Sequence, residues 1–369
     1  MTGTVGLTDV RPGPGAVAHR EAGLEQVMAR VSAATPNGRW RFWGSLNVEG
    51  LTMADGVLNV GAFGEGYADR RHPHTFVHEV AGGLVLPIAG ARTSLTVGKG
   101  FAAFGTDDPM HRPALKYPVN HHWAQIVERF VTIGAVEAGP VTVEATLFNG
   151  DEPERPEQWP ALERYGDSWA LRTTVRPATG LGLQVSRAHV ASPEHRAGAG
   201  PDAEKWSASG LARVPLGGGR AYAFGEWAQT DEAGRRFTSL LGEVEWQAGA
   251  HRPYVRVERT DRPEEERQLD PFATVRPHLD DHLLGITRWT ILTAGYGVRV
   301  TVGTVVLEPV VEGAFARVRE TTGALFDPVL FYGGDTVRSV TVALRVHWGT
   351  AGTMGRYGVQ DDTIVPHHH

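Results

Sequence analysis

Six histidines gather in one stretch of the chain and are its first candidates for chemistry. They are His72, His74, His78, His111, His121 and His122. Side chains two residues apart share a face of an extended chain, so the first three of them point to the same side. Neutral imidazoles that converge on one point could coordinate Zn²⁺ or Cu²⁺, with Glu79 or Asp69 as the oxygen ligand. This spacing alone is a weak indication of a metal site.

The same histidines also have a purely structural interpretation. They could hydrogen-bond loop carbonyl groups and stack on Tyr67, Tyr117 and Trp123, which would pin outer loops over the mouth of the fold. The neighbouring run Asp69-Arg70-Arg71 could likewise pair with Asp107-Asp108 and hold a loop inward, or it could be a solvated run of charges. The sequence leaves these alternatives open.

Arginines and glutamates on one face of successive segments form the second set of candidates. They are Arg41, Glu49, Glu144, Arg172, Arg176, Arg213, Glu243, Glu245, Arg256, Glu258, Glu308, Glu312 and Arg345. The opposite face is built from small and aliphatic residues, with tryptophans near segment ends. If the charged face lines a lumen, opposed rings of charge would select solutes by charge and size. Alternatively, the charges pair across strands and fill a closed barrel.

The segments that carry these charges alternate with a period of two from residue 39 onward, which predicts β-strands. We expect fourteen strands, near 39–52, 75–88, 92–104, 126–137, 141–149, 168–177, 181–189, 205–215, 220–229, 236–247, 252–261, 282–293, 305–319 and 337–348. Short turns alternate with long polar loops, which is typical of outer-membrane barrels. An even number of strands places the first and the last residue of the barrel on the same side, which is the side of the short turns. The predicted fold is therefore an all-β, antiparallel, up-and-down transmembrane β-barrel.

A β-sandwich or a β-helix is the soluble alternative, since alternation alone also fits those folds. Fourteen strands in one meander exceed a usual open sheet, and the thin apolar face suits a wall that contacts lipid. The lumen of such a barrel would be wider than that of a packed eight-stranded barrel and narrower than that of a general porin. We therefore expect a narrow or partly plugged channel.

The two ends of the chain are predicted to contribute no strands to the barrel, which spans 39–348. Residues 1–20 are rich in Gly and Pro, and Leu24, Val27, Met28 and Val31 are spaced as on one face of a helix. We expect 1–38 to form a flexible arm and a short amphipathic helix over 21–34, on the periplasmic side or as a plug. Residues 349–369 are expected to form a periplasmic tail. Its final histidines look like a purification-tag remnant and enter no metal argument.

Composition excludes several classes of protein. The chain has 36 Lys+Arg against 42 Asp+Glu, and no basic cluster, which argues against nucleic-acid binding. It has no Cys, so disulfides and thiolate metal sites are absent. No apolar run is long enough for a membrane helix, and no signal peptide is visible at the start of this numbering. A mature barrel whose signal peptide has been removed fits these features.

Three stretches carry a family resemblance: 69–79 (DRRHPHTFVHE), 147–153 (LFNGDEP) and 354–359 (MGRYGV). They resemble a group of poorly characterised, porin-like outer-membrane β-barrel proteins of Gram-negative bacteria, over about residues 39–360. The resemblance implies a barrel in the outer membrane and no particular cargo. It also implies additional strands at the start of the chain, so twelve or sixteen strands are alternatives to fourteen.

These observations predict a monomeric outer-membrane channel for small polar or ionic solutes, a metal ion among them, in contact with lipid and lipopolysaccharide. The alternative is a closed barrel whose His-rich outer loops bind a metal or a partner, or serve a structural role. A lipid-modifying enzyme is a third hypothesis. Such an enzyme requires a catalytic Ser and a His on the outward face of the barrel. No serine lies in a recognisable catalytic motif, so we predict no enzyme, and no cofactor other than Zn or Cu at the histidines.

Overall fold

The computed structural model describes residues 1–11, 19–52, 74–106, 112–115, 117–119, 121–153, 155–192, 200–265, 283–322, 327–349 and 355–363. Within these ranges the strands are β1 (Thr2–Arg11), β2 (His19–Ala34), β3 (Trp40–Asn47), β4 (Val77–Ile88), β5 (Ala91–Gly100), β6 (Arg129–Ala138), β7 (Val141–Phe148), β8 (Ser168–Ala178), β9 (Leu181–Val190), β10 (Ala203–Leu216), β11 (Gly219–Glu232), β12 (Arg235–Gln247), β13 (His251–Glu265), β14 (Leu283–Val298), β15 (Val300–Val302), β16 (Val305–Thr322) and β17 (Thr336–Trp348). The helices are short: η1 (Glu49–Leu51), α2 (His121–Ala124), η3 (Leu162–Arg164), α3 (Pro328–Tyr332) and η5 (Gly358–Thr363). None of the described helices is long and apolar enough to cross a membrane.

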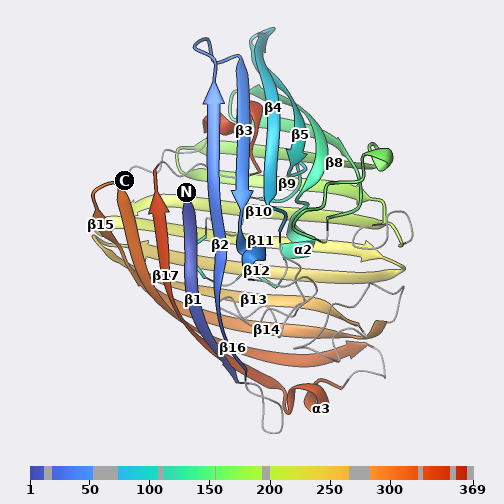
Figure 1. Ribbon diagram of the computed structural model, residues 1–369. Helices are drawn as coiled ribbons and strands as arrows, with labels where there is room; N and C mark the ends of the chain where they lie inside the picture. The colour runs from blue at the N-terminus through green and yellow to red at the C-terminus, as the bar shows by residue number, and fades with distance from the viewer. Residues whose placement is uncertain are drawn as a thin grey trace.

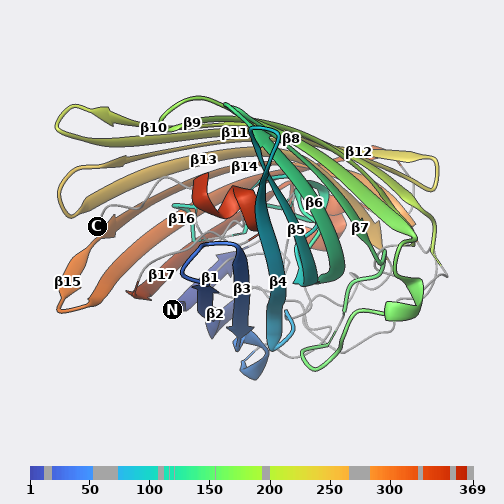
Figure 2. The ribbon, with the colours of Figure 1, turned by 90° about the horizontal axis from the view of Figure 1, so that it is seen from above.

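The described strands form one closed antiparallel barrel (Figures 1 and 2). Neighbours in sequence are neighbours in the sheet, and β1 pairs with β17 over its whole length, which closes the ring. β14 and β15 both pair with β16 and form one interrupted wall strand. The 17 described segments therefore make a 16-stranded wall.

The fourteen strands predicted from residue 39 onward are all present, and the total of fourteen is wrong by two. The additional strands, β1 and β2, lie in the part that we expected to be an arm and a helix, so the alternative of sixteen strands is confirmed. β1 was hidden because most of its inward positions are Thr and Gly, with only Val10 apolar there, and only Val5 and Leu7 mark its outward face. The barrel begins at residue 2, and 1–38 is not a separate unit.

The predicted helix over 21–34 is instead β2, and a β-bulge explains the misleading pattern. The pairing of β1 with β2 shifts between Thr2 and Thr4, so β2 holds one extra residue there. A bulge exchanges the inward and outward positions of the strand that follows it. Leu24 before the bulge and Val31 after it are both exposed, whereas Met28 is buried inside. Because of the bulge, apolar residues that are spaced as on a helix fit a β-strand.

The outer surface of the barrel is apolar, as a wall in contact with lipid requires. Leu171, Leu183 and Val342 are exposed at outward positions, which agrees with the aliphatic outer face that the sequence predicts. Outward tryptophans Trp246 and Trp348 lie near the short-turn ends of their strands, where aromatic girdles of membrane barrels lie.

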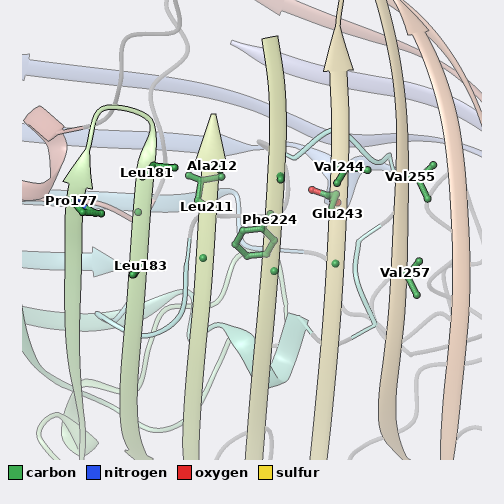
Figure 3. Close-up of a pocket in the computed structure, with 15 residues that line it drawn as sticks. Pro177, Leu181, Leu183, Leu211, Ala212, Phe224, Glu243, Val244, Val255 and Val257 are labelled. Atoms are coloured by element: carbon green, nitrogen blue, oxygen red, sulfur yellow. The ribbon is translucent and has the colours of Figure 1, made fainter. Parts of the chain in front are cut away.

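One part of this wall is hollowed because small residues replace large ones on adjacent strands. Gly210, Gly225 and Gly242 are register partners on β10, β11 and β12. Together with Leu181, Val257 and their neighbours they line a shallow, mostly apolar hollow of about 680 Å³ (Figure 3). Its lining comes mainly from outward positions, so the hollow belongs to the lipid-facing wall and not to a solute pathway.

Candidate functional site

Ion pairs join neighbouring strands on the inner wall. Arg172 on β8 donates two hydrogen bonds to Glu144 on β7, at 2.6 and 2.8 Å. Arg256 on β13 donates to Glu243 on β12 at 2.6 Å. The side chains of both pairs are at most 2 % exposed. Removing one member of such a buried pair leaves an uncompensated charge, which costs about 3–5 kcal/mol. These pairs therefore fix the wall in one arrangement.

The structure places the predicted lumen residues inside the barrel. On strands, inward positions are held by Arg41, Glu144, Arg172, Arg176, Arg213, Glu243, Glu245, Arg256, Glu258, Glu308, Glu312 and Arg345. Glu49 lies in η1 and is fully buried. Arg252, which the sequence did not single out, pairs with both Glu245 and Glu308. The inner wall is thus rich in paired charges.

The described residues of the connection between β5 and β6, which are 101–106, 112–115, 117–119 and 121–128 and are called the inner loop below, lie inside the barrel. They reach strands on the far side of the ring. The backbone N–H of Leu115 donates to Glu312 on β16 at 2.7 Å, and that of Val119 donates to Glu258 on β13 at 2.9 Å. Arg345 on β17 donates to the carbonyl of Ala114 at 3.3 Å. Two wall carboxylates and one guanidinium therefore anchor this inner loop across the barrel.

Further contacts hold the same inner loop near β11 to β13. Arg112 lies 3.5 Å from Glu226, and the indole of Trp123 stacks on Phe237 with the ring centroids 5.1 Å apart. The Trp123 indole N–H donates to the carbonyl of Asp261 at 3.0 Å. The loop therefore combines charged, aromatic and backbone contacts with the wall and narrows the lumen.

Of the six candidate histidines, the four that the structure describes form a chain of ring contacts with Tyr117, in the order His78, His74, Tyr117, His121 and His122. Three of them contact a carboxylate or a carbonyl. His74 Nδ1 lies 2.8 Å from Glu49, and the rings of His74 and His78 are 4.9 Å apart. His121 Nδ1 hydrogen-bonds the carbonyl of Pro118 at 3.1 Å, and its ring contacts Tyr117. These contacts are of the kind expected from the loop-pinning interpretation.

These contacts do not form a set of metal ligands. Among the described residues, no group of three or more His, Cys, Asp or Glu side chains could hold a metal ion. His72 and His111 lie outside the described residues, and so do Asp69-Arg70-Arg71 and Asp107-Asp108. The predicted pairing of those charged runs therefore stays a prediction.

Glu128, just before β6, is the hub of the histidine network. It accepts hydrogen bonds from His78 Nδ1 at 2.8 Å and from the hydroxyl of Thr75 at 2.5 Å, and Lys99 lies 3.9 Å away. Burial alone would raise the pKa of Glu128, but the positive field and hydrogen bond of His78, with smaller contributions from His74 and Lys99, lower it to about 2. The carboxylate is therefore charged at neutral pH and ties the start of β4 to β6.

Residues 355–363, which follow β17 in the chain, lie inside the barrel, whereas we expected a periplasmic tail. In Figure 2 their red helical turn lies within the ring of strands. Tyr357 donates to Glu79 on β4 at 2.5 Å and contacts Trp43 on β3 edge to face. Burial raises the pKa of Tyr357, and the charge of Glu79 raises it further, so its hydroxyl remains a donor. The prediction for 349–369 is thus corrected for residues 355–363.

The inner loop and the inner tail were the parts that the sequence did not reveal. Both are held by backbone groups and scattered polar side chains, which leave no period in the sequence. One signal was present: the supposedly polar loop contains Ala114, Leu115 and Val119, which are all buried. Apolar residues in a loop this long could have indicated an inner position.

Comparison with known proteins identifies the fold. No protein-family model and no curated protein matches the chain. Among solved structures, it is similar to Pseudomonas putida OprB with a TM-score of 0.55 and 8% identity, covering 94% of this chain and 93% of that one. It is also similar to an anion-selective porin from Comamonas acidovorans, with a TM-score of 0.53 and 9% identity, covering 93% and 97%. Salmonella typhi OmpF in complex with daunomycin gives 0.51 and 11%, covering 93% and 96%. The chain therefore has the fold of bacterial outer-membrane porins, and its apolar outer wall agrees with that location.

Proposed function

We propose that this protein is a narrow outer-membrane channel for small polar or ionic solutes, with metal ions among the candidates. The observation that carries the proposal is the inner loop, held across a charged lumen by Glu312, Glu258 and Arg345. A barrel that served only as a wall would need no segment fixed across its lumen. A fixed segment in a charged lumen leaves a restricted path on which size and charge are both tested.

A barrel without an open path is the second candidate, and burial of the inner charges favours it. Arg256, Glu243 and Glu312 are at most 1 % exposed, so protein atoms cover much of the inner wall. In that case the barrel would have a structural or partner-binding role through its outer loops. The two candidates differ in one property, which is whether solutes cross the barrel.

Liposome swelling distinguishes the two candidates. Purified protein is reconstituted into liposomes, which are then diluted into isotonic solutions of glycine, arabinose or raffinose. We expect swelling with the small solutes and none with the trisaccharide, because the inner loop restricts the path. Protein-free liposomes are the control. Absence of swelling with every solute, in protein shown by circular dichroism to be folded, would contradict the channel and support the closed barrel.

The remaining parts of the proposal concern the surroundings of the barrel. We infer that the outer wall contacts phospholipid and lipopolysaccharide, and that the barrel works as a monomer. The resemblance to the group of porin-like proteins described above also stays a proposal, because no protein-family model matches the chain. Size-exclusion chromatography with light scattering tests the monomer, and a trimer would contradict it.

A further inference from the structure

Residues 355–360 of the segment 355–363 are held against the inner wall by hydrogen bonds. Two carboxylates receive it: Tyr357 donates to Glu79, and the side-chain amide of Gln360 donates to Glu144 at 3.2 Å. The N–H of Val359 donates to the hydroxyl of Ser94 on β5 at 3.2 Å. Arg176 on β8 donates to the side-chain oxygen of Gln360. The segment thus contacts β4, β5, β7 and β8 with its side chains and its backbone.

Guanidinium groups of the wall donate hydrogen bonds to backbone carbonyls of the same segment. Arg172 donates to the carbonyl of Gly355, and Arg41 donates to the carbonyl of Gly358, both at 3.5 Å. These are the contacts by which a peptide in an irregular conformation is held, because its carbonyls have no strand partner. Arg41 and Arg176 lie near the short-turn ends of β3 and β8, so the segment occupies the periplasmic half of the lumen.

The wall is also shaped for the segment. A Cβ atom on Gly100 of β5 would lie 2.2 Å from the Tyr357 hydroxyl, so the missing side chain of Gly100 provides the space for that hydroxyl. On the segment itself, Gly358 has φ +57°, and a Cβ there would lie 2.1 Å from the hydroxyl of Ser94. Val359, which follows, is completely buried. Shape and polarity therefore fit on both sides of the contact.

We propose that the inner faces of β3 to β8 form a peptide-binding site, and that the chain's own residues 355–363 fill it as a tethered plug in the periplasmic half of the lumen. The ligand class is a short peptide with an Arg-Tyr-Gly core, whose tyrosine hydroxyl and backbone carbonyls are the recognised groups. Binding of the peptide stands on the contacts above, and its effect on conduction rests on the proposed channel function.

The first test is hydrogen exchange in the uncut, full-length chain. Gly100→Ala adds a methyl group where Tyr357 sits, so we expect the amides of 357–360 to lose protection. Gly134→Ala on β6 is the matched control, because a Cβ there meets nothing within 4 Å. Equal protection of 357–360 in wild type and Gly100→Ala would overturn the proposal, as would a segment that exchanges freely in the wild type.

The second test asks whether the site accepts the peptide from outside. A protease site is placed after Gly349, the full chain is folded, and the segment is then cut. We expect the cut protein to bind a fluorescent peptide of residues 354–363, and the uncut protein not to bind it. The Tyr357→Phe form of this peptide should bind about tenfold or more weakly, because it lacks a hydrogen bond to a charged carboxylate. Equal binding of both peptides, or equal binding to cut and uncut protein, would overturn the proposal.

Current across planar bilayers separates this proposal from the channel function. Cutting should raise the current, and the peptide should lower it again when added from the periplasmic side. Specific peptide binding without current in any form would reject the channel and leave the peptide site in place. Current that is the same before and after cutting would reject the plug and leave the channel in place.

Discussion

Replacing Glu312 by alanine is the sharpest test of how the inner loop is held. The carboxylate accepts the N–H of Leu115 at 2.7 Å and the hydroxyl of Tyr254 at 2.8 Å, and it is fully buried. A hydrogen bond to a charged group contributes about 1.5–3 kcal/mol. Losing the bond to Leu115 should therefore favour local opening of the loop by about 10- to 100-fold. The orphaned Tyr254 hydroxyl adds about 1–3 kcal/mol of destabilisation to the barrel.

Hydrogen exchange read by mass spectrometry measures this opening directly. In Glu312→Ala, residues 112–119 should exchange about 10- to 100-fold faster, while the strands remain protected by their ladders. Glu204→Ala is the matched control, because its side chain is 41% exposed and pairs only at the surface with Arg187 and His189. A surface pair of this kind contributes at most about 1 kcal/mol. Unchanged exchange of 112–119 in Glu312→Ala would show that the carboxylate does not anchor the loop.

Four further predictions concern the wall and the histidine network. Val342→Arg should lower stability in lipid by about 2–4 kcal/mol if this residue lies at the bilayer midplane, measured by urea unfolding; an unaltered midpoint would mean that it does not face lipid. Arg172→Met should cost about 3–5 kcal/mol in the same assay by leaving Glu144 unpaired, and the double variant with Glu144→Met should recover most of the loss; additive losses would contradict the pair. The pKa of Glu128 is lowered from 4.5 to about 2, so the stability that this carboxylate gives the folded protein is present above pH 4.5 and is lost as pH falls toward 2. Amide exchange at the outer end of β4 should show this loss, and Glu128→Gln should remove the pH dependence. Calorimetric titration of tag-free protein with Zn²⁺ should give equal, weak binding in wild type and His74→Ala. Tight binding in the wild type that is lost in the variant, and that weakens below a pH of about 6.5, would restore the metal interpretation.

The sequence predicted the barrel because every wall strand must separate lipid from the interior. That requirement writes a period of two into each strand, as in the run from Val340 to Trp348. The same reasoning predicted inward positions for Arg172 and Glu312. It failed at β2, where the bulge opposite Thr2 to Thr4 interrupts the period.

The positions of the inner loop and the tail could not be predicted in this way. Leu115 is held through its backbone N–H, and Gly355 through its carbonyl, so the identity of the residue says nothing about the partner. The position of Tyr357 depends on the absence of a side chain at Gly100 of β5, and these two residues are far apart in the sequence. Such contacts appear only once the barrel has brought the segments together.

Single-channel recording in planar bilayers tests the central claim most directly. We expect the full-length protein to give discrete, small current steps, because the inner loop leaves a restricted path. Glu312→Ala should give larger or noisier steps, and Glu204→Ala should match the wild type. Recording with and without Zn²⁺ or Cu²⁺ shows whether a metal alters the path. Folded protein that inserts into the bilayer and gives no steps, in wild type and in Glu312→Ala alike, would contradict the channel.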